Sequence, residues 1–422
     1  MQTNFQQTPM QFLQHCVANG ISRGYFVTLD GKLQSSHPAL DAAATFIQHS
    51  PDYVAHEGIF FQVDAAAEAI YCAFVHSTKR GQAQGGTRMR QYDTMADILT
   101  DGMRLAKGMT DKNACAGLWW GGGKGIIYTA KDPRQVSGDH RTHIFTEYGK
   151  FVASLGGCYI TAEDMNTSPE DMRVIHANNR FCTCIPVECG GAGNPSGATA
   201  LGVFKGVLAA NDFVFGKESG LKGKHIVLQG AGNVGGRLLD YLAAAGAKIS
   251  VFEPNEQTRT HFEATYSREQ VRFIAAEEVF TTEADIFSPN AIGGILTAET
   301  IAQLKVKVVA GGANNQLQFP IEDAERIRAK GIAYVPDFII NCMGIVNCAN
   351  EQYGYLAEDI EPQTERVYAR VYEILAGAAQ QQITTYAFAN QLATQLGQEE
   401  HPIFGHRGLR IIRHAIAEGW GK

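Results

Sequence analysis

Apolar residues in the first part of the chain follow the spacing of strands and then that of a helix. Residues 59–61 and 69–75 are short, nearly continuous apolar runs, which are typical of buried strands. Apolar side chains then recur every three or four positions across residues 95–109, and Thr94 precedes them as a candidate N-cap. The pattern therefore predicts two strands followed by one long helix.

Strand and helix patterns alternate from about residue 195 onward. We predict helices at residues 198–211 and 237–245, and strands at residues 226–229, 248–252, 284–287, 306–310 and 333–335. Such alternation indicates a parallel sheet covered by helices. From Pro362 to its end the chain is mostly helical.

The expected fold class is α/β with two domains, because 422 residues exceed what one hydrophobic core usually supports. We predict an N-terminal α/β domain at residues 1–195, a Rossmann dinucleotide-binding domain at 196–355, and C-terminal helices at 356–422 that return to the first domain. Residues 1 to about 55 form a polar, helix-tending extension. The extension is expected to be either a peripheral cap or an oligomer contact.

Charge and composition exclude several classes of protein. The formal net charge of -7, from 36 basic and 43 acidic residues, gives no electrostatic reason to expect nucleic acid or an anionic membrane as partner. The N-terminus has no basic segment followed by an apolar core, and no window approaches the roughly 18 apolar residues of a membrane span. The nine cysteines are scattered without a zinc pattern, which indicates free thiols in a reducing cytoplasm and no metal site.

Residues 230–235 have the G-x-G-x-x-G spacing of a dinucleotide-binding turn. The hexapeptide lies between a predicted strand and a predicted helix, and Glu253 ends the next predicted strand about 20 positions later. Such glycines permit a tight turn and a close approach of backbone to a pyrophosphate, and the helix N-terminus attracts its charge. Glu253 would bind the adenosine ribose hydroxyls and repel a 2'-phosphate, which favours NAD over NADP. The predicted cofactor-binding residues here are Gly230, Ala231, Gly232, Asn233, Val234, Gly235 and Glu253.

A second glycine cluster precedes a lysine. Gly121-Gly122-Gly123 is expected to form a loop that presents Lys124 and leads into a strand at residues 126–128. Glycines let the backbone approach a ligand closely. A lysine beside another cation in a closed cleft is expected to lose basicity. Lys112 is such a neighbour only if the fold brings the two lysines together, which the sequence alone does not decide.

These segments, and others in the same order and spacing, resemble the glutamate/leucine/phenylalanine/valine dehydrogenase superfamily, and most of all its leucine- and phenylalanine-type members. The likeness extends from about Gly58 to the C-terminus. It is carried by residues 85–89, 109–114, 117–125, 159–164, 167–172, 193–200, 230–235, 310–317, 336–341 and 350–355. The resemblance implies that the first domain binds the substrate and forms a homo-oligomer, and that a catalytic cleft separates it from the NAD-binding domain.

The resemblance also implies roles for individual residues. Lys112 matches the lysine that binds the substrate α-carboxylate. Lys124 matches the catalytic lysine, which activates the water that attacks the imino acid, and Asp164 matches the acid that exchanges protons with the amino group and that water. Asn314 matches an asparagine near the nicotinamide and the substrate. Arg88 and Thr199 match positions near the cofactor.

The side-chain pocket of the substrate is expected to be mostly apolar. The resemblance places the substrate against Gln84, Gly85, Gly86, Ala162, Ile345 and Cys348. At the position of Gln84, glutamate-specific members usually carry a lysine and leucine-type members an apolar residue. An unpaired buried amide costs about 1–3 kcal/mol, so Gln84 favours an apolar or aromatic substrate with a polar atom. Trp119-Trp120 is expected either to pack in the core or to line the pocket.

The expected reaction is oxidative deamination of an L-amino acid to the 2-oxo acid and ammonia, with reduction of NAD. Two alternatives remain at this point. A non-catalytic NAD-binding sensor or assembly protein would not need Lys112, Lys124 and Asp164 together. An NADP-linked glutamate dehydrogenase is disfavoured by Gln84 and Glu253.

Overall fold

The computed structural model describes residues 5–217 and 219–421, and the chain divides into two compact units. Unit 1 consists of Met1–Asn194, Cys348–Tyr355 and Thr394–Lys422, and unit 2 consists of Pro195–Asn347 and Leu356–Ala393. The expected boundary after residue 195 lies next to the observed one. The expectation that all of residues 356–422 return to the first domain differs from the structure, because residues 356–393 pack with unit 2.

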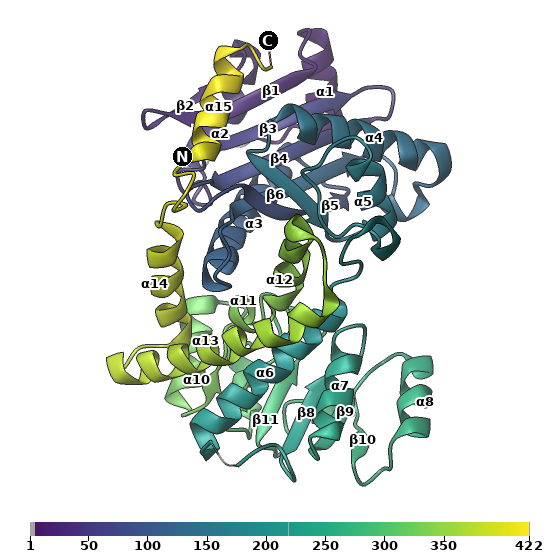
Figure 1. The fold of residues 1–422 in the computed structure, drawn as a ribbon, viewed down its shortest axis with the longest axis vertical. Coiled ribbons are helices and arrows are strands. Elements are labelled where there is room, and N and C mark those ends of the chain that lie inside the picture. The colour runs from purple at the N-terminus through teal and green to yellow at the C-terminus, as the bar shows by residue number, and fades with distance from the viewer. Residues whose placement is uncertain (1–4, 218, 422) are drawn as a thin grey trace. The chain divides into compact units, whose positions relative to one another are not determined.

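Unit 1 is an α/β unit around one seven-stranded mixed sheet, with the strand order β2-β1-β3-β4-β6-β5-β7 (Figure 1). Its strands are β1 (Arg23–Leu29), β2 (Lys32–Ser35), β3 (Gly58–Asp64), β4 (Ala69–Ser77), β5 (Ala83–Arg90), β6 (Gly121–Thr129) and β7 (Tyr159–Glu163). Its helices are α1 (Pro9–Ala18), α2 (Asp41–His49), α3 (Met95–Cys115), α4 (Gly138–Ser154), α5 (Pro169–His176) and α15 (Arg407–Ala417). Short 3-10 turns are η1 (Pro38–Leu40), η2 (Pro133–Gln135), η3 (Val187–Cys189) and η5 (Asn350–Tyr353).

Helices cover both faces of this sheet, because strand residues alternate between two hydrophobic cores. One core joins the sheet to α1, α2 and α3 through Phe12, Ile47 and Met103. The other joins it to α4, α5 and α15. The structure thus has the strands expected at residues 59–61 and 69–75 and the helix expected after Thr94, whose hydroxyl accepts from the Asp97 N–H in a capping box.

The N-terminal extension is part of the sheet rather than a peripheral cap. Its β1 pairs with both β2 and β3 in antiparallel register. Phe26 on β1 and Phe12 on α1 are buried in the same core. The polar composition of the extension concealed these strands, since β2 lies at the sheet edge and is partly exposed.

The glycines before Lys124 lie within β6 and do not form the expected loop. A Cβ at Gly122 would collide with the backbone of α3 at Thr110, and one at Gly123 would collide with the Tyr159 ring and the Phe74 carbonyl. These positions therefore require glycine because helix and strands approach them closely, not because they turn the chain. The lysine is presented from a rigid strand.

Unit 2 contains a six-stranded parallel sheet with the order β10-β9-β8-β11-β12-β13, which is the doubly wound order of the expected Rossmann domain. Its strands are β8 (His225–Gln229), β9 (Lys248–Phe252), β10 (Val271–Phe273), β11 (Ile286–Pro289), β12 (Val308–Val309) and β13 (Ala333–Tyr334). Its helices are α6 (Ser196–Phe215), α7 (Gly235–Ala244), α8 (Glu256–Thr265), α9 (Ala298–Gln303), α10 (Pro320–Ala329), α11 (Asp337–Ile340) and α13 (Ile360–Gln381), with turns η4 (Ala276–Glu278) and η6 (Ala357–Asp359). Helices α12 (Met343–Ala349) and α14 (Thr385–Gly397) each run from one unit into the other.

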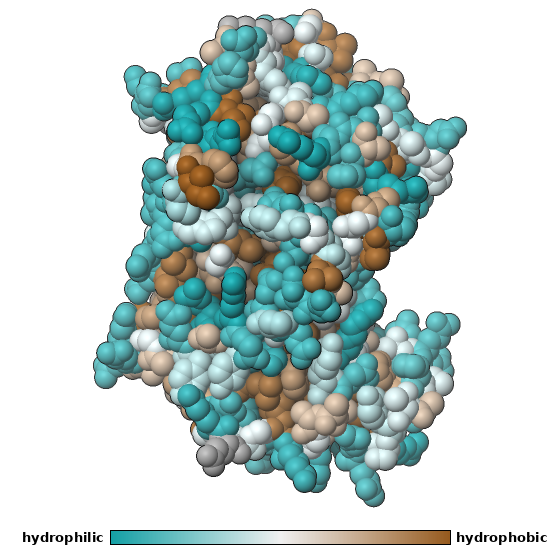
Figure 2. Space-filling model, viewed as in Figure 1, coloured by the Kyte–Doolittle hydropathy of each residue, from teal (hydrophilic) through white to brown (hydrophobic). Residues whose placement is uncertain are grey.

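Helix α13 belongs to unit 2 because it packs along α6. The Tyr368 hydroxyl donates to Asp212 at 2.7 Å, and Lys205 forms an ion pair with Glu365. Among the described helices, α6 is the one long and apolar enough to cross a membrane by length and composition alone. Nearly half of its apolar window is buried within the unit, which accounts for that composition. The face of the molecule in Figure 2 is mainly hydrophilic, with separate hydrophobic patches.

We predict that Gly122→Ala lowers the free energy of unfolding by about 1–3 kcal/mol, because its Cβ overpacks the contact between β6 and α3. Gly108→Ala is the matched control, since a Cβ at this exposed position of the same helix meets no atom within 4 Å. The control is expected to stabilise by about 0.4–1 kcal/mol. Denaturation midpoints in urea measure both effects. Equal midpoints for the two variants would contradict the packing argument.

Candidate active site

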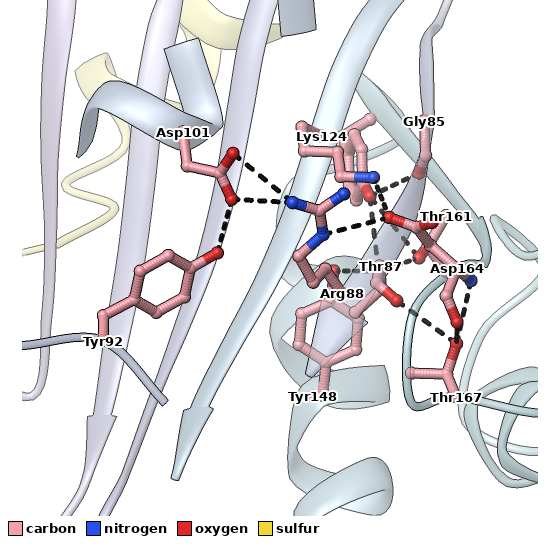
Figure 3. A network of polar contacts seen from close by, with 11 residues as sticks. Gly85, Thr87, Arg88, Tyr92, Asp101, Lys124, Tyr148, Thr161, Asp164 and Thr167 are labelled. Atoms are coloured by element: carbon pink, nitrogen blue, oxygen red, sulfur yellow. Dashed lines mark hydrogen bonds and ion pairs between the residues drawn. The ribbon is translucent and has the colours of Figure 1, made fainter. Parts of the chain in front are cut away.

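The side chain of Lys124 lies on the α3 face of β6. It shares this face with Ile126 and Tyr128, which belong to the core between the sheet and α3. The lysine is buried, and its Nζ donates a hydrogen bond to Oδ2 of Asp164 (Figure 3). A buried ammonium group and a carboxylate therefore meet in direct contact.

Glycines on β5 make this contact possible. Asp164 directly follows β7, and β5 separates β7 from β6 in the sheet. A Cβ at Gly86 would lie 2.8 Å from the Asp164 Cβ, and one at Gly85 would collide with the Gly123 carbonyl. Because Gly86 has no side chain, the aspartate can reach across β5 to the lysine, while glycine at Gly85 lets β5 pack against the β6 backbone beside Lys124. Close packing at both positions explains the Gly85-Gly86 pair, and the sequence did not reveal this packing.

Nearby cations keep Asp164 ionised. Burial of the carboxyl group opposes ionisation, but the charges of Lys124 and Arg88 and the hydrogen bonds from Lys124 and the Met165 backbone outweigh it. The pKa of Asp164 is lowered to about 2. At neutral pH this carboxylate can therefore accept a proton from a bound ligand.

Arg88 lies between two carboxylates (Figure 3). Its Nη1 is 3.0 Å from Oδ2 of Asp101, and its Nε is 3.5 Å from Oδ2 of Asp164. The sequence placed Arg88 near the cofactor; within unit 1 the structure gives it these two acidic neighbours.

Gln84 is buried at the start of β5, level with Gly122 on one neighbouring strand and Ile160 on the other. Its Oε1 is 3.5 Å from Nδ2 of Asn113, whose own Oδ1 is buried without a hydrogen-bond partner. Two side-chain amides thus lie together in an otherwise apolar region.

Lys112 lies in the last turn of α3, one residue before Asn113. Asn113 Nδ2 donates to the Gly121 carbonyl at 2.6 Å. This bond fixes the end of the helix that carries Lys112 against the beginning of the strand that carries Lys124. The two lysines therefore occupy adjoining elements of unit 1.

Ala162 and Cys348 belong to the same buried apolar cluster of unit 1, whereas Ile345 belongs to unit 2. The Cys348 sulfur is 2.7 Å from that of Cys184. The contact with this neighbouring thiol, followed by burial, raises the pKa of Cys348 well above its usual value. An uncharged, apolar surface results at Cys348.

Unit 2 has the local geometry required for a dinucleotide. Gly230 has a φ of 89°, a conformation that favours glycine, and a Cβ at Gly235 would collide with the Gly230 carbonyl. No side chain caps α7 at Val234, although the Gly236 N–H in its first turn donates to the Gly232 carbonyl at 2.8 Å. Oε2 of Glu253 accepts from the Ala231 N–H at 2.7 Å, so the acid lies beside the glycine turn. These residues fit the pyrophosphate and ribose of a dinucleotide.

Asn314 and Thr199 are both held by local hydrogen bonds in unit 2. Asn341 Nδ2 donates to Oδ1 of Asn314 at 2.6 Å, which fixes the orientation of the Asn314 amide. The Thr199 hydroxyl donates to the Pro195 carbonyl at 2.9 Å in the first turn of α6.

Comparison with known proteins identifies the family. The model described as Glu/Leu/Phe/Val dehydrogenase, dimerisation domain, matches residues 66–180, and that described as Glutamate/Leucine/Phenylalanine/Valine dehydrogenase matches residues 250–396. The leucine dehydrogenase of Geobacillus stearothermophilus is 39% identical over 340 residues, which are 81% of this chain and 90% of that protein. The chain belongs to the glutamate/leucine/phenylalanine/valine dehydrogenase family.

Other members of the family are similar over comparable lengths. The phenylalanine dehydrogenase of Lysinibacillus sphaericus is 37% identical over 360 residues, or 84% of this chain and 92% of that protein. The crystal structure of L-tryptophan dehydrogenase from Nostoc punctiforme has a TM-score of 0.70 and 32% identity, and covers 81% of this chain and 96% of its own. The match to residues 66–180 includes Lys112, Lys124 and Asp164, whereas the glycine turn lies outside both matched segments.

Two partly buried glutamates have raised pKa values that the sequence did not indicate. Burial, followed by the charges of Asp171 and Asp164, raises the pKa of Glu163 to about 7. Burial also raises the pKa of Glu351 to about 7, although backbone N–H groups of Ala192, Cys184 and Ile185 partly offset it. Both glutamates lie in segments that carried the family resemblance, but only the fold reveals their burial.

The two tryptophans differ in their environment. Trp120 is 4% exposed and Trp119 is 42% exposed, with the Arg80 guanidinium 4.2 Å from the centre of the Trp119 ring. Both line a cavity of about 880 Å³ in unit 1 whose described lining residues do not include Lys124 or Asp164. Trp120 thus packs in the core, which is one of the two expected alternatives. Trp119 lines this cavity, whose described lining does not include the catalytic pair.

We predict that Glu351→Gln becomes progressively more stable than the wild type between pH 5 and pH 8. The folded-state pKa of about 7 exceeds the ordinary 4.5, so the stability that the protonated glutamate contributes is lost as pH rises through this window. The amide stays neutral, and the gain at pH 8 is expected to be on the order of 1–2 kcal/mol after allowance for screening. Denaturant unfolding at several pH values measures it.

The exposed neighbour Glu188 supplies the control. Glu188→Gln is expected to differ from the wild type by the same small amount at every pH. A pH-independent difference for Glu351→Gln as well would show that the buried carboxyl group does not titrate in this range.

Proposed function

We propose that the protein catalyses the NAD-dependent oxidative deamination of an L-amino acid with an apolar or aromatic side chain, giving the 2-oxo acid and ammonia, and also the reverse reaction. The observation that carries the proposal is the direct contact between the buried Lys124 and the partly exposed Asp164. The relatives support it, since they include leucine, phenylalanine and tryptophan dehydrogenases.

The residues of unit 1 would divide the acid–base work. Lys112 binds the α-carboxylate of the substrate. Asp164, ionised at neutral pH, takes a proton from the substrate ammonium group, so that the amine nitrogen can form a C=N bond as hydride leaves Cα. When it is bound, NAD supplies the acceptor for this hydride. Lys124 then orients and activates the water that adds to the imino carbon, and Asp164 passes protons between this water and the departing ammonia.

The cofactor is NAD rather than NADP. Glu253 lies beside the glycine turn, where its carboxylate would accept hydrogen bonds from the ribose hydroxyls and repel a 2'-phosphate. Thr199 and Asn314 are proposed to contact the nicotinamide end. An NADP-linked glutamate dehydrogenase is disfavoured for the same reason, and because Gln84 offers no positive charge to a substrate carboxylate.

The substrate side chain is proposed to contact Gln84, Ala162, Ile345 and Cys348. Three of these are apolar, and Gln84 adds an amide. An aromatic side chain with an N–H or O–H group could donate a hydrogen bond to this amide, whereas a purely aliphatic side chain would leave it only the long 3.5 Å contact with Asn113. We therefore favour an aromatic substrate with a polar atom. A homo-oligomeric state is also proposed, on the basis of the match to the dimerisation domain.

One assay separates the proposal from its alternatives. NADH and NADPH formation is followed with a panel of L-amino acids at alkaline pH, beside a direct measurement of NAD binding. The proposal requires NADH formation with an apolar or aromatic amino acid. NAD binding without turnover of any amino acid would indicate a sensor or assembly protein, and rapid glutamate oxidation with NADP would indicate a glutamate dehydrogenase.

We predict that Lys124→Met and Asp164→Asn each lower kcat/KM by about 10²–10⁴, because each removes one member of the proton-transferring pair. NAD affinity, measured by titration calorimetry, is expected to stay within about twofold, since the glycine turn lies in unit 2. Lys150→Met is the control, because Lys150 is an exposed lysine on α4 paired with Glu147. Full activity in either catalytic variant would rule out the assigned roles.

We predict that Gln84→Leu raises kcat/KM for leucine relative to tyrosine and tryptophan by about tenfold or more, because the polar partner of the substrate is lost. Gln82→Leu, two residues earlier, is the control, as its amide donates instead to the Gly157 carbonyl at 2.9 Å. Unchanged ratios of kcat/KM in Gln84→Leu would remove Gln84 from the side-chain pocket.

A further inference from the structure

The Arg88 guanidinium is hydrogen-bonded to Asp101 through Nη1, whereas its Nε makes no hydrogen bond. Its Nη1 approaches both oxygens of Asp101, at 3.0 and 3.4 Å. Its Nε is buried and has no hydrogen-bond partner, and at 3.5 Å from Asp164 Oδ2 it is held there by charge alone. The position of Arg88 beside Asp164 therefore depends on what holds its other end.

Asp101 is itself fixed by a second contact. Tyr92 follows β5 and donates its hydroxyl to Asp101 Oδ2 at 2.6 Å, the same oxygen that Arg88 approaches most closely (Figure 3). Asp101 comes from α3, the helix whose other end carries Lys112. A line of contacts thus runs from Tyr92 through Asp101 and Arg88 to Asp164.

We propose that Asp101, fixed by Tyr92, is a positioning residue that holds the Arg88 guanidinium beside Asp164, so that this carboxylate has a second cation besides Lys124 and stays ionised. The proposal rests on the role of Asp164 as proton acceptor in the proposed function. It gives Arg88 an electrostatic task in unit 1, whether or not the same side chain also contacts the cofactor.

Other charges in the region must be considered. Lys124 contacts Asp164 directly, and Glu163, its chain neighbour, acts on it weakly. The charge of Arg90 lowers the pKa of Tyr92, and Arg104 on α3 interacts electrostatically with Asp101. All of these charges remain when Asp101 alone is replaced, and so does the Lys124–Asp164 contact.

Replacing Asp101 separates positioning from a simple charge effect, because the two predict opposite signs. Asp101 is an anion, so its loss without any movement of Arg88 would lower the pKa of Asp164 further. If Arg88 instead leaves Asp164 when Asp101 is lost, Asp164 loses a cation and its pKa rises. An arginine beside an aspartate lowers the aspartate pKa by about 1–3 units, which sets the size of the expected rise.

The test is an infrared titration of the Asp164 carboxyl group in the full-length protein. Each spectrum is taken as the difference from the matching variant that also carries Asp164→Asn, so that only Asp164 contributes. Wild-type Asp164 is expected to stay ionised down to about pH 2 or until unfolding. In Asp101→Ala it is expected to protonate about one unit or more higher, within the range in which circular dichroism reports a folded protein.

Two further variants and a control complete the test. Asp101→Asn retains a hydrogen-bond acceptor and Tyr92→Phe removes only one support, so both are expected to shift the Asp164 titration less than Asp101→Ala. Asp52→Ala is the control, because Asp52 pairs with Arg104 at 3.1 Å and is 20% exposed, against 24% for Asp101. The control is expected to leave the titration unchanged.

A titration that is unchanged or moves to lower pH in Asp101→Ala overturns the proposal. This readout needs no turnover, so it is independent of the proposed function. If the titration moves upward but the wild type oxidises no amino acid, the positioning by Asp101 stands and the proposed function fails. If the wild type is active, kcat in Asp101→Ala is expected to fall about tenfold at one pH unit below the raised Asp164 pKa and to recover at higher pH.

Discussion

The strongest constraint on unit 1 is the contact between a buried ammonium group and a carboxylate, Lys124 and Asp164. Removing Asp164 would leave the buried Lys124 ammonium group without its carboxylate, which costs several kcal/mol in proteins, so the surrounding backbone must hold both in contact. The carboxylate approaches from two strands away, and only glycine at Gly86 leaves room for it. The same requirement for close approach explains the glycines before Lys124. The glycines, the strand order and the Lys124–Asp164 contact of this unit therefore depend on one another.

The two units contribute in different ways. The dinucleotide-binding features of unit 2 are local: a glycine turn, an uncapped helix start and an acid at the end of the next strand. The catalytic features of unit 1 are assembled from β5, β6, β7 and α3, which are far apart in sequence. This difference explains why the glycine turn can be recognised from six residues, while the ionisation of Asp164 depends on Arg88 and, through it, on Asp101 and Tyr92.

The proposed substrate choice depends on a few polar side chains in a mostly apolar pocket. Cys348 and Ala162 lie in one buried cluster, and the contact with Cys184, followed by burial, raises the pKa of the Cys348 thiol and keeps it neutral. Gln84 and Asn113 place two amides nearby, one of them with an unpaired buried oxygen. Known relatives that act on leucine, phenylalanine and tryptophan differ in side-chain size and polarity, and these amides favour the polar aromatic end of that range.

The α/β class, the parallel sheet of unit 2 and the capped helix after Thr94 could be predicted from the sequence, because these depend on periodicity and on local turn chemistry. The roles of the catalytic candidates came from the resemblance to the family. Which residues meet became known only from the fold. It placed Gly122 inside a strand, added the N-terminal extension to the sheet, packed α13 on unit 2 and brought Asp101 to Arg88. The burial of Glu163 and Glu351 was equally invisible in sequence. The physical reason is that burial, close packing and pKa depend on neighbours in space, and a single sequence specifies neighbours only along the chain.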